Sequence, residues 1–198
     1  GLWLSGKLGR GEPHGLEAAA ASSLSDHVII IGYGFNGANV GRACRAAGLP
    51  YLIIEMNPDT VRREKAAGES IFYGDAANQS ILRHAGLEHA RVLVVTIADP
   101  AATRRITASA KALNPKVFII ARTRLISEIA RLKALGADEV IPEEYETGVV
   151  IFNRVLQRFF VPLDEILSLS SQIRSEGYEM LRALNPPDPR KEDIDSML

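Results

Sequence analysis

Three glycines between positions 32 and 37 are the residues of this sequence best placed to do chemistry. They follow the pattern G-x-G-x-x-G in Gly32-Tyr33-Gly34-Phe35-Asn36-Gly37. Gly32 allows a sharp exit from the preceding segment, Gly34 leaves space for a phosphate near the backbone, and Gly37 allows a helix to pack closely. Free backbone N–H groups at the start of that helix would then bind the anion. The spacing therefore indicates a site for a nucleotide phosphate.

A carboxylate follows this loop at a suitable distance along the chain. Glu55 closes the apolar run 51–54 and lies 23 positions after Gly32, near the roughly 20 positions typical of an acid that binds ribose hydroxyls. An acid there favours a free 2′-hydroxyl and repels a 2′-phosphate, so a ligand of the NADP type is disfavoured. The alternative is a glycine turn that only packs a helix on a sheet.

The charge of the phosphate needs a partner. The segment from Gly32 to Gly41 contains no lysine or arginine, so backbone N–H groups must meet this charge unless a cation comes from elsewhere. Such a loop suits one or two phosphates better than three. Arg122, at the end of a later apolar run, is the candidate for the added charge. An arginine that only extends from a strand end into solvent explains it equally well.

Alternating apolar and amphipathic segments must position these groups. Six apolar runs predict strands at 27–31, 51–55, 70–73, 91–96, 116–122 and 139–141, and the segments between them predict helices at 38–47, 60–67, 78–85, 100–113 and 126–135. This alternation predicts an α/β fold, a Rossmann-like doubly wound parallel sheet of six strands in the order 3-2-1-4-5-6. Ligands of such sheets lie at the carboxyl ends of the strands, so Gly74-Asp75-Ala76 and Thr96-Ile97-Ala98 should flank the adenine and ribose.

The alternation ends after Pro142. A helix over 146–160 is apolar on more than one face, which predicts a partner surface, and a last helix is predicted over 164–184. We therefore expect four parts: a linker or artificial extension at 1–25, a nucleotide-binding domain at 26–142, crossover and C-terminal helices at 143–184, and a disordered tail at 185–198.

Composition excludes several classes of function. The 198 residues are 46% hydrophobic with a formal net charge of -1, and no basic cluster alternates with aromatic residues, so we expect no nucleic-acid partner. No stretch reaches the roughly 18 to 20 apolar residues of a membrane span. The single cysteine, Cys44, excludes an intrachain disulfide and is expected in the core. The histidines lack metal-ligand spacing, and the acids at 138–139 and 143–144 indicate a solvated face, so no metal site is expected.

The sequence offers little support for catalysis. It lacks the motifs of serine hydrolases, zinc proteases and P-loop enzymes, and only the region after the sheet is left for a substrate domain. A small NAD-dependent oxidoreductase is the alternative, with His84 or Tyr73 as its proton donor. A purely structural dimerisation module is a third interpretation, and it predicts no nucleotide at all.

Several blocks of the sequence together resemble a known family, the RCK domain, also called KTN or TrkA-N. The blocks are residues 32–37, 53–58, 73–76, 94–96, 120–122 and 136–143. The likeness covers about residues 26–160 and is closest to the version attached to Kef-type cation/proton antiporters of the monovalent cation:proton antiporter-2 group.

The resemblance implies a regulatory domain without enzyme activity, at the cytoplasmic face of the inner (plasma) membrane. It implies AMP as first choice, or NAD(H), as the ligand, homodimers through the helix 146–160, and control of an attached or associated potassium channel or potassium/proton antiporter. Carried over by position, the ligand-binding residues are Gly32, Tyr33, Gly34, Phe35, Asn36, Gly37, Glu55, Met56, Asn57, Asp75, Ala76, Thr96, Ile97 and Ala98, to which the strand ends add Gly74 and Arg122. Many relatives have a basic residue where this loop has Phe35 and Asn36, which leaves AMP and NAD(H) both open.

Overall fold

A computed structural model describes residues 24–184 of the chain. Positions 1–23 of the expected linker and the whole of the expected tail at 185–198 lie outside the described residues. Within the described part, one sheet of six parallel strands has the order β3-β2-β1-β4-β5-β6. The predicted fold class and strand order are therefore confirmed.

The strands are short and pair in register with their neighbours. Their bounds are β1 (Val28–Ile31), β2 (Tyr51–Glu55), β3 (Ile71–Tyr73), β4 (Val92–Val95), β5 (Phe118–Thr123) and β6 (Glu139–Pro142). In the middle of the sheet, Ile30 of β1 lies opposite Ile53 of β2 on one side and Val94 of β4 on the other. Because all strands run in one direction, their carboxyl ends form a single edge, and every loop expected to bind the ligand lies there.

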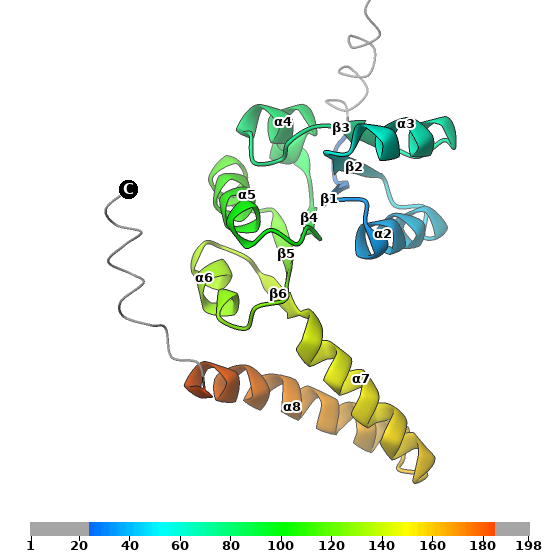
Figure 1. Ribbon diagram of the computed structural model, residues 1–198, viewed down its shortest axis with the longest axis vertical. Helices are drawn as coiled ribbons and strands as arrows, with labels where there is room; N and C mark the ends of the chain where they lie inside the picture. The colour runs from blue at the N-terminus through cyan, green and yellow to red at the C-terminus, as the bar shows by residue number, and fades with distance from the viewer. Residues whose placement is uncertain (1–23, 185–198) are drawn as a thin grey trace, which may run out of the picture.

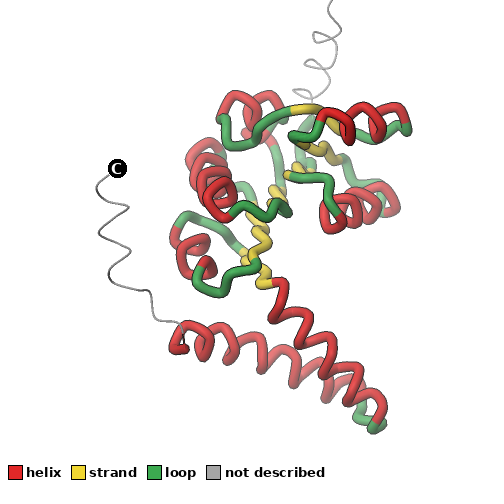
Figure 2. The backbone as a smooth tube through the Cα atoms, viewed as in Figure 1, coloured by secondary structure: helices red, strands yellow, loops and turns green. Residues whose placement is uncertain are grey.

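Helices cover the sheet on both faces, as Figures 1 and 2 show. The helices α2 (Phe35–Ala46) and α3 (Pro58–Ala66) lie on one face, beside β1, β2 and β3. The helices α4 (Gln79–His84), α5 (Pro100–Leu113) and α6 (Glu128–Ala134) lie on the other face, with a 3-10 turn η1 (Leu87–His89) leading into β4. The sheet is thus the middle of three layers.

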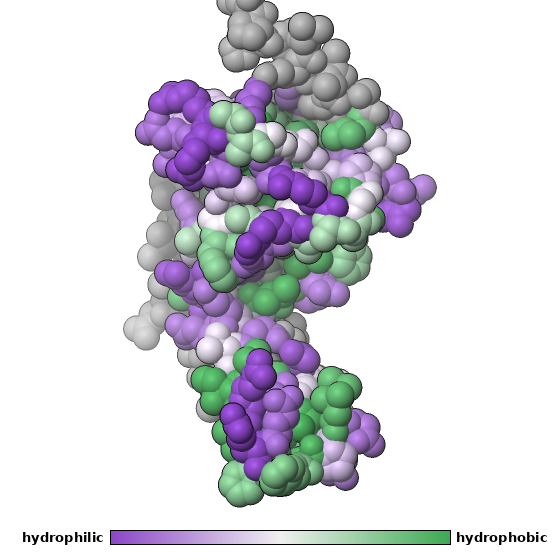
Figure 3. Space-filling view, turned by 90° about the vertical axis from the view of Figure 1, so that its right-hand side faces the viewer, coloured by the Kyte–Doolittle hydropathy of each residue, from purple (hydrophilic) through white to green (hydrophobic). Residues whose placement is uncertain are grey.

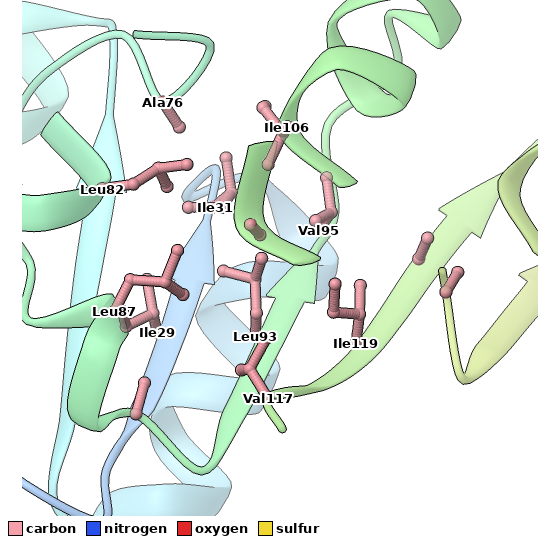
Figure 4. Close-up of a cluster of buried hydrophobic side chains, with 14 of the residues drawn as sticks. Ile29, Ile31, Ala76, Leu82, Leu87, Leu93, Val95, Ile106, Val117 and Ile119 are labelled. Atoms are coloured by element: carbon pink, nitrogen blue, oxygen red, sulfur yellow. The ribbon is translucent and has the colours of Figure 1, made fainter. Parts of the chain in front are cut away.

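The core explains why the strands are apolar along their whole length. Ile29 and Ile31 of β1 pack with Leu93 of β4 and Ile106 of α5 on the side of α4 to α6 (Figure 4). Ile30, between them in sequence, points to the opposite face and joins a smaller cluster under α2 and α3. Burying one such side chain contributes about 1.5–3 kcal/mol, so both faces of the central strands stabilise the fold.

Local signals account for the starts of α3 and α5. Asn57 accepts hydrogen bonds from the N–H groups of the first turn of α3, and Asp99 accepts one from Ala102 N in the first turn of α5. Each cap is followed by proline at the first helical position, which has no N–H to satisfy. These starts were expected, and apart from α2 and α7 the predicted elements match the observed bounds to within two positions.

Two helices begin earlier than predicted. The helix α2 begins at Phe35 rather than at residue 38, because the second half of the glycine loop already forms its first turn behind Gly34 as N-cap. The helix α7 (Glu143–Arg158) begins at Glu143 rather than at 146, directly behind Pro142, and carries three acids in its first turn. Acids stabilise that end of a helix through its dipole, so the run after Pro142 is a favourable start.

The last two helices form a hairpin that extends from the sheet (Figure 1). After α7, Phe160 takes a left-handed backbone conformation with φ 56°, and α8 (Leu163–Leu184) returns beside α7. Arg174 of α8 donates two hydrogen bonds to Glu146 of α7, at 3.0 and 2.8 Å, and Ser170 Oγ donates to Asn153 Oδ1 at 2.8 Å. None of the helices in the described part combines the length and the apolar character needed to cross a membrane.

Candidate functional site

The glycine loop joins β1 to α2 at the carboxyl edge of the sheet. Gly32 has φ 91°, a left-handed conformation that suits glycine, and a Cβ there would lie 2.9 Å from Ile97 Cγ2. A Cβ at Gly37 would lie only 1.9 Å from the carbonyl oxygen of Gly32. Glycine at these two positions therefore lets helix, strand and loop approach one another closely.

Gly34 differs from the other two glycines of the motif. It is the N-cap of α2 and has no side chain to cap the helix, and nothing lies within 4 Å of the place that its Cβ would take. The first turn of α2 contains no acid, and its N–H groups have no acceptor within the helix. This part of the loop thus presents free donors, the positive end of a helix dipole and open space, which together suit an anion.

Glu55 lies beside this loop, at the end of β2. Its Oε2 accepts a hydrogen bond from the backbone N–H of Tyr33 at 2.7 Å, and its Oε1 accepts one from Asn57 N at 2.7 Å. Each carboxylate oxygen has a second lone pair, so the group can still accept from hydroxyls. The structure therefore holds Glu55 in a fixed orientation next to the glycine loop.

A buried network behind the loop was not found from the sequence. Glu69, with a side chain only 4% exposed, accepts hydrogen bonds from Tyr33 Oη at 3.1 Å, Arg45 Nη2 at 2.6 Å and Tyr51 Oη at 2.5 Å. Burial by itself would raise the pKa of Glu69, but these donors and the N–H of Ser70 bring its pKa below the usual value. Burial and the bond to Glu69 raise the pKa of Tyr33 to about 12.

This network holds Tyr33 at both ends. Its backbone N–H is bound by Glu55, and its hydroxyl is bound by Glu69. Since Tyr33 lies between the first two glycines of the motif, the network fixes the loop that they form. In the sequence, Glu69 is visible only as an acid between Gly68 and a predicted strand. No spacing rule connects an acid at that place with the glycine loop.

The ends of β3 and β4 complete the edge. A Cβ at Gly74 would lie 2.8 Å from Ile81 Cγ2, and Asp75 Oδ1 accepts from Ala77 N at 2.9 Å, which shapes the turn. Ala76 is 3% exposed, so its side chain belongs to the core rather than to the edge. Thr96 Oγ1 donates to Ile31 O at 2.8 Å and ties the end of β4 to the end of β1. Ala98, by contrast, is exposed.

Large apolar side chains are exposed at the same edge. Phe35 is 83% exposed, Met56 58% and Tyr73 59%, and they follow β1, follow β2 and end β3, respectively. Burying such groups is favourable, and flat or flexible apolar side chains are suitable partners for the face of a base. Their position next to the anion site and Glu55 is the arrangement that a nucleotide would cover.

Arg122 is not the freely solvated arginine of the alternative interpretation. Its side chain is 13% exposed, and its Nη1 donates to Thr96 O at 3.2 Å while Nη2 binds Glu143. Its Nε is buried and has no hydrogen-bond partner among the described residues. Arg122 thus lies at the carboxyl edge and connects the loop after β4 with the start of α7.

The acids near β6 form specific contacts and are not simply a solvated face. Asp138 accepts from Lys111 Nζ at 2.9 Å and from Ile119 N at 2.8 Å; burial opposes these donors, which nevertheless lower its pKa. The guanidinium of Arg122 lowers the pKa of Glu143. Among the described residues, no group of three or more His, Cys, Asp or Glu side chains is placed to hold a metal.

The two residues named for an oxidoreductase have different surroundings. The ring of His84 packs against Phe72 with the centroids 5.3 Å apart, so it contributes to the packing of α4 on β3. Tyr73 is exposed at the end of β3. Cys44 is buried, as expected of a core residue.

Comparison with known proteins identifies the family of this chain. The TrkA-N domain model matches residues 28–143. Over 182 residues the chain is 31% identical to the putative K(+) efflux antiporter KefB of Alkalimonas amylolytica; the match covers 92% of this chain and 27% of that protein. The chain therefore spans about a quarter of the length of this relative.

Two solved structures are similar in fold and sequence. The TrkA-N domain of the inner membrane protein ybaL from Escherichia coli has a TM-score of 0.63 and 32% identity, covering 66% of this chain and 96% of that one. The Shewanella denitrificans Kef CTD in AMP bound form has a TM-score of 0.66 and 26% identity, covering 80% and 96%. The family model matches more than half of this chain, and the glycine loop, Glu55 and the six parallel strands lie within the matched residues. The chain therefore belongs to the TrkA-N domain family.

Proposed function

We propose that this chain is a regulatory domain that binds an adenine nucleotide at the carboxyl edge of its sheet and controls a cation/proton antiporter or potassium channel, attached or associated. The observation that carries the proposal is the space at Gly34, which is open while the glycines on either side are closely packed. A glycine turn that served packing alone would need Gly32 and Gly37, but it would not need a glycine at position 34.

AMP is the first choice of ligand and NAD(H) the second. The loop offers backbone donors without a basic side chain, which suits a small number of phosphates, and Arg122 is the nearby cation that can share their charge. Glu55 is placed to accept from the ribose hydroxyls, and Phe35, Met56 and Tyr73 are placed to contact the base. The AMP bound to the similar Kef CTD of Shewanella denitrificans supports the same order of preference.

We also propose that the chain forms a homodimer through α7. Within the described residues, this hairpin exposes a series of large apolar side chains, and Figure 3 shows such side chains gathered at its end of the molecule. The exposed set is Val150, Ile151, Val155, Phe159, Phe160, Leu163 and Leu167. Apolar surface of this kind is favourably buried against a second copy.

In this proposal the domain acts at the cytoplasmic face of a membrane, without catalysis of its own. A nucleotide changes the arrangement of the two α7 helices only as far as its affinity differs between the two arrangements of the dimer. The relation to transport comes from the likeness to the KefB antiporter, of which this chain covers 27%.

Nucleotide binding is tested by calorimetric titration of the wild-type chain with AMP, ADP, ATP, NAD and NADH, repeated with Glu55→Ala. We expect AMP or NAD(H) to bind, and Glu55→Ala to weaken binding about 10- to 100-fold because hydrogen bonds to a charged acceptor are lost. Glu88→Ala removes the same charge from η1, which leads into the amino end of β4, and should bind like wild type. Absence of binding by the wild-type chain would leave only the structural interpretation.

A further inference from the structure

Arg122 joins two parts of the molecule that are distant in sequence. Its Nη1 donates to the carbonyl of Thr96 in the loop after β4, and its Nη2 binds the carboxylate of Glu143, the first residue of α7. One guanidinium thus contacts both the proposed nucleotide edge and the helix that leads away from it. No other described arginine or lysine is recorded with contacts to both Thr96 and α7.

The guanidinium of Arg122 reaches toward the strand that carries the glycine loop. Neighbouring strands are about 4.8 Å apart, and β4 separates β5 from β1. From the end of β5, Arg122 reaches across to the end of β4, where it meets Thr96 O at 3.2 Å. Thr96 in turn donates from Oγ1 to Ile31 O at 2.8 Å, at the entry to the glycine loop. Thr96 therefore links Arg122 to the entry of the glycine loop, where we propose that the phosphate binds.

Arg122 has an unused donor for such a ligand. The side chain is only 13% exposed, and its Nε is buried without a hydrogen-bond partner among the described residues. A buried N–H without an acceptor is costly, and in native proteins it usually has a partner. A phosphate oxygen would supply one, and its charge would compete with that of Glu143 for the same cation.

Glu143 has a second cation that can hold it when Arg122 turns away. Arg124, which is 65% exposed, approaches the same carboxylate with Nε at 3.3 Å. The carboxylate lies in the first turn of α7, where Pro142 gives the helix no side-chain cap. Arg122 belongs to β5 and is largely buried, whereas Arg124 follows the strand and is exposed, so a change of partner alters how the first turn of α7 is attached to β5.

We infer that Arg122 is shared between the nucleotide phosphate and Glu143, so that binding of the nucleotide weakens the attachment of α7 to the sheet. This inference rests on the proposed nucleotide function and specifies how that site communicates with the hairpin. By thermodynamic reciprocity, removing the charge of Glu143 must strengthen nucleotide binding by the same factor by which the nucleotide weakens the ion pair.

The test is the affinity of the full chain for AMP, or for NAD if AMP does not bind, in four variants. Glu143→Gln should bind about five-fold more tightly than wild type, at the low end of usual coupling because the Glu143 side chain is 39% exposed. Glu144→Gln is the matched control: it removes the same charge from the same helical turn, and should bind like wild type. Arg122→Gln should bind more weakly, and adding Glu143→Gln to it should produce no gain.

A second measurement follows α7 itself. Hydrogen exchange in peptides covering 143–158 should become faster at saturating nucleotide in wild type, and should not change in Arg122→Gln at saturation. Melting of each variant without ligand checks that it is folded. Equal affinities of Glu143→Gln and Glu144→Gln, with a binding wild type, would overturn this inference alone. If the wild-type chain bound neither AMP nor NAD, the proposed function would fail and this inference with it.

Discussion

The backbone N–H of Tyr33 donates a 2.7 Å hydrogen bond to Oε2 of Glu55. This bond joins the loop after β1 to the end of β2, two elements that are adjacent in the sheet and separated by a whole helix in sequence. The glycine loop itself therefore orients the carboxylate that we propose for the ribose. A nucleotide that bridges the two would meet donors and acceptor at a distance set by the fold rather than by a flexible side chain.

Alanine substitutions in the glycine loop should have separate effects on the stability of the fold and on nucleotide binding. Gly34→Ala is expected to leave the free energy of unfolding within about 0.5 kcal/mol of wild type, because its Cβ would meet no atom within 4 Å. The same methyl group would occupy the phosphate space, so nucleotide affinity should fall at least about ten-fold. Gly37→Ala should destabilise the fold by about 1–3 kcal/mol or more, since its Cβ would lie 1.9 Å from Gly32 O.

Urea unfolding and calorimetric titration of the two variants, side by side, measure both effects. Gly148→Ala is the control for adding a methyl group without a steric clash. A Cβ there, on the exposed side of α7, also meets nothing within 4 Å. It should stabilise the helix by up to about 1 kcal/mol. Normal nucleotide binding by Gly34→Ala would show that the open space is not the phosphate site.

Tyr33 should titrate separately from ordinary tyrosines. Burial and the bond to Glu69 raise its pKa to about 12 in the folded chain, from the ordinary tyrosine value of 10.0. Because the folded pKa is the higher one, the stability from the protonated hydroxyl is complete below pH 10.0 and is lost between there and about 12. Ultraviolet titration should show a late tyrosinate step that is smaller in Tyr33→Phe, because Tyr51 also binds Glu69 and has a raised pKa, and that is shifted down in Glu69→Gln. A wild-type titration with no late step would contradict this account.

His27 should make the fold sensitive to mild acid. Its side chain is buried, and in the neutral tautomer its Nε2 donates a hydrogen bond to Ala85 O at 2.9 Å. Burial lowers its pKa below the ordinary histidine value of 6.5. The unfolded chain then binds the proton more readily, so stability is complete above pH 6.5 and falls as the pH drops through and below this value.

The measurement for His27 is the midpoint of urea unfolding between pH 7.5 and 5. We expect the free energy of unfolding of the wild type to fall over this range by about 1.4 kcal/mol for each unit of difference in pKa. His27→Gln should be less stable at pH 7.5 and should lose less on acidification. The control is His84→Gln, which changes a histidine of α4 that is not among the charged neighbours of His27. Equal slopes for wild type and His27→Gln would assign the acid sensitivity to other groups.

The hairpin should carry the dimer contact. Ile151 is 60% exposed on α7, so Ile151→Lys removes no core packing and should leave the melting temperature of the monomer unchanged. If α7 forms the dimer, the lysine places a charge in an apolar interface, and the mass from sedimentation should shift to that of one chain. Leu49→Lys is the matched control, because Leu49 is 51% exposed in the turn after α2. A monomeric wild type, or a dimer unaffected by Ile151→Lys, would remove α7 from the proposal.

The sequence by itself determined the architecture. Continuous apolar runs separated by glycine, proline and capping residues predicted six parallel strands and their order, because such runs are stable only when both faces of a sheet are covered. The start of α5 behind Asp99 was predicted to the residue and that of α3 behind Asn57 to within two positions, since a side-chain cap followed by proline is a purely local device. The glycine loop and Glu55 were also visible, because their spacing is fixed by one strand-helix-strand unit.

Only the tertiary structure decided which groups meet across elements. Glu69 lies more than thirty positions from Tyr33 and meets its hydroxyl because the pairing of β3 with β2 brings the segment before β3 within reach of that side chain, a relation that no local pattern encodes. Arg122 and Glu143 meet because β5 and β6 are paired, so that the end of one strand lies beside the helix that follows the other. Periodicity and caps act over a few residues, whereas these contacts depend on how the sheet folds the whole chain together.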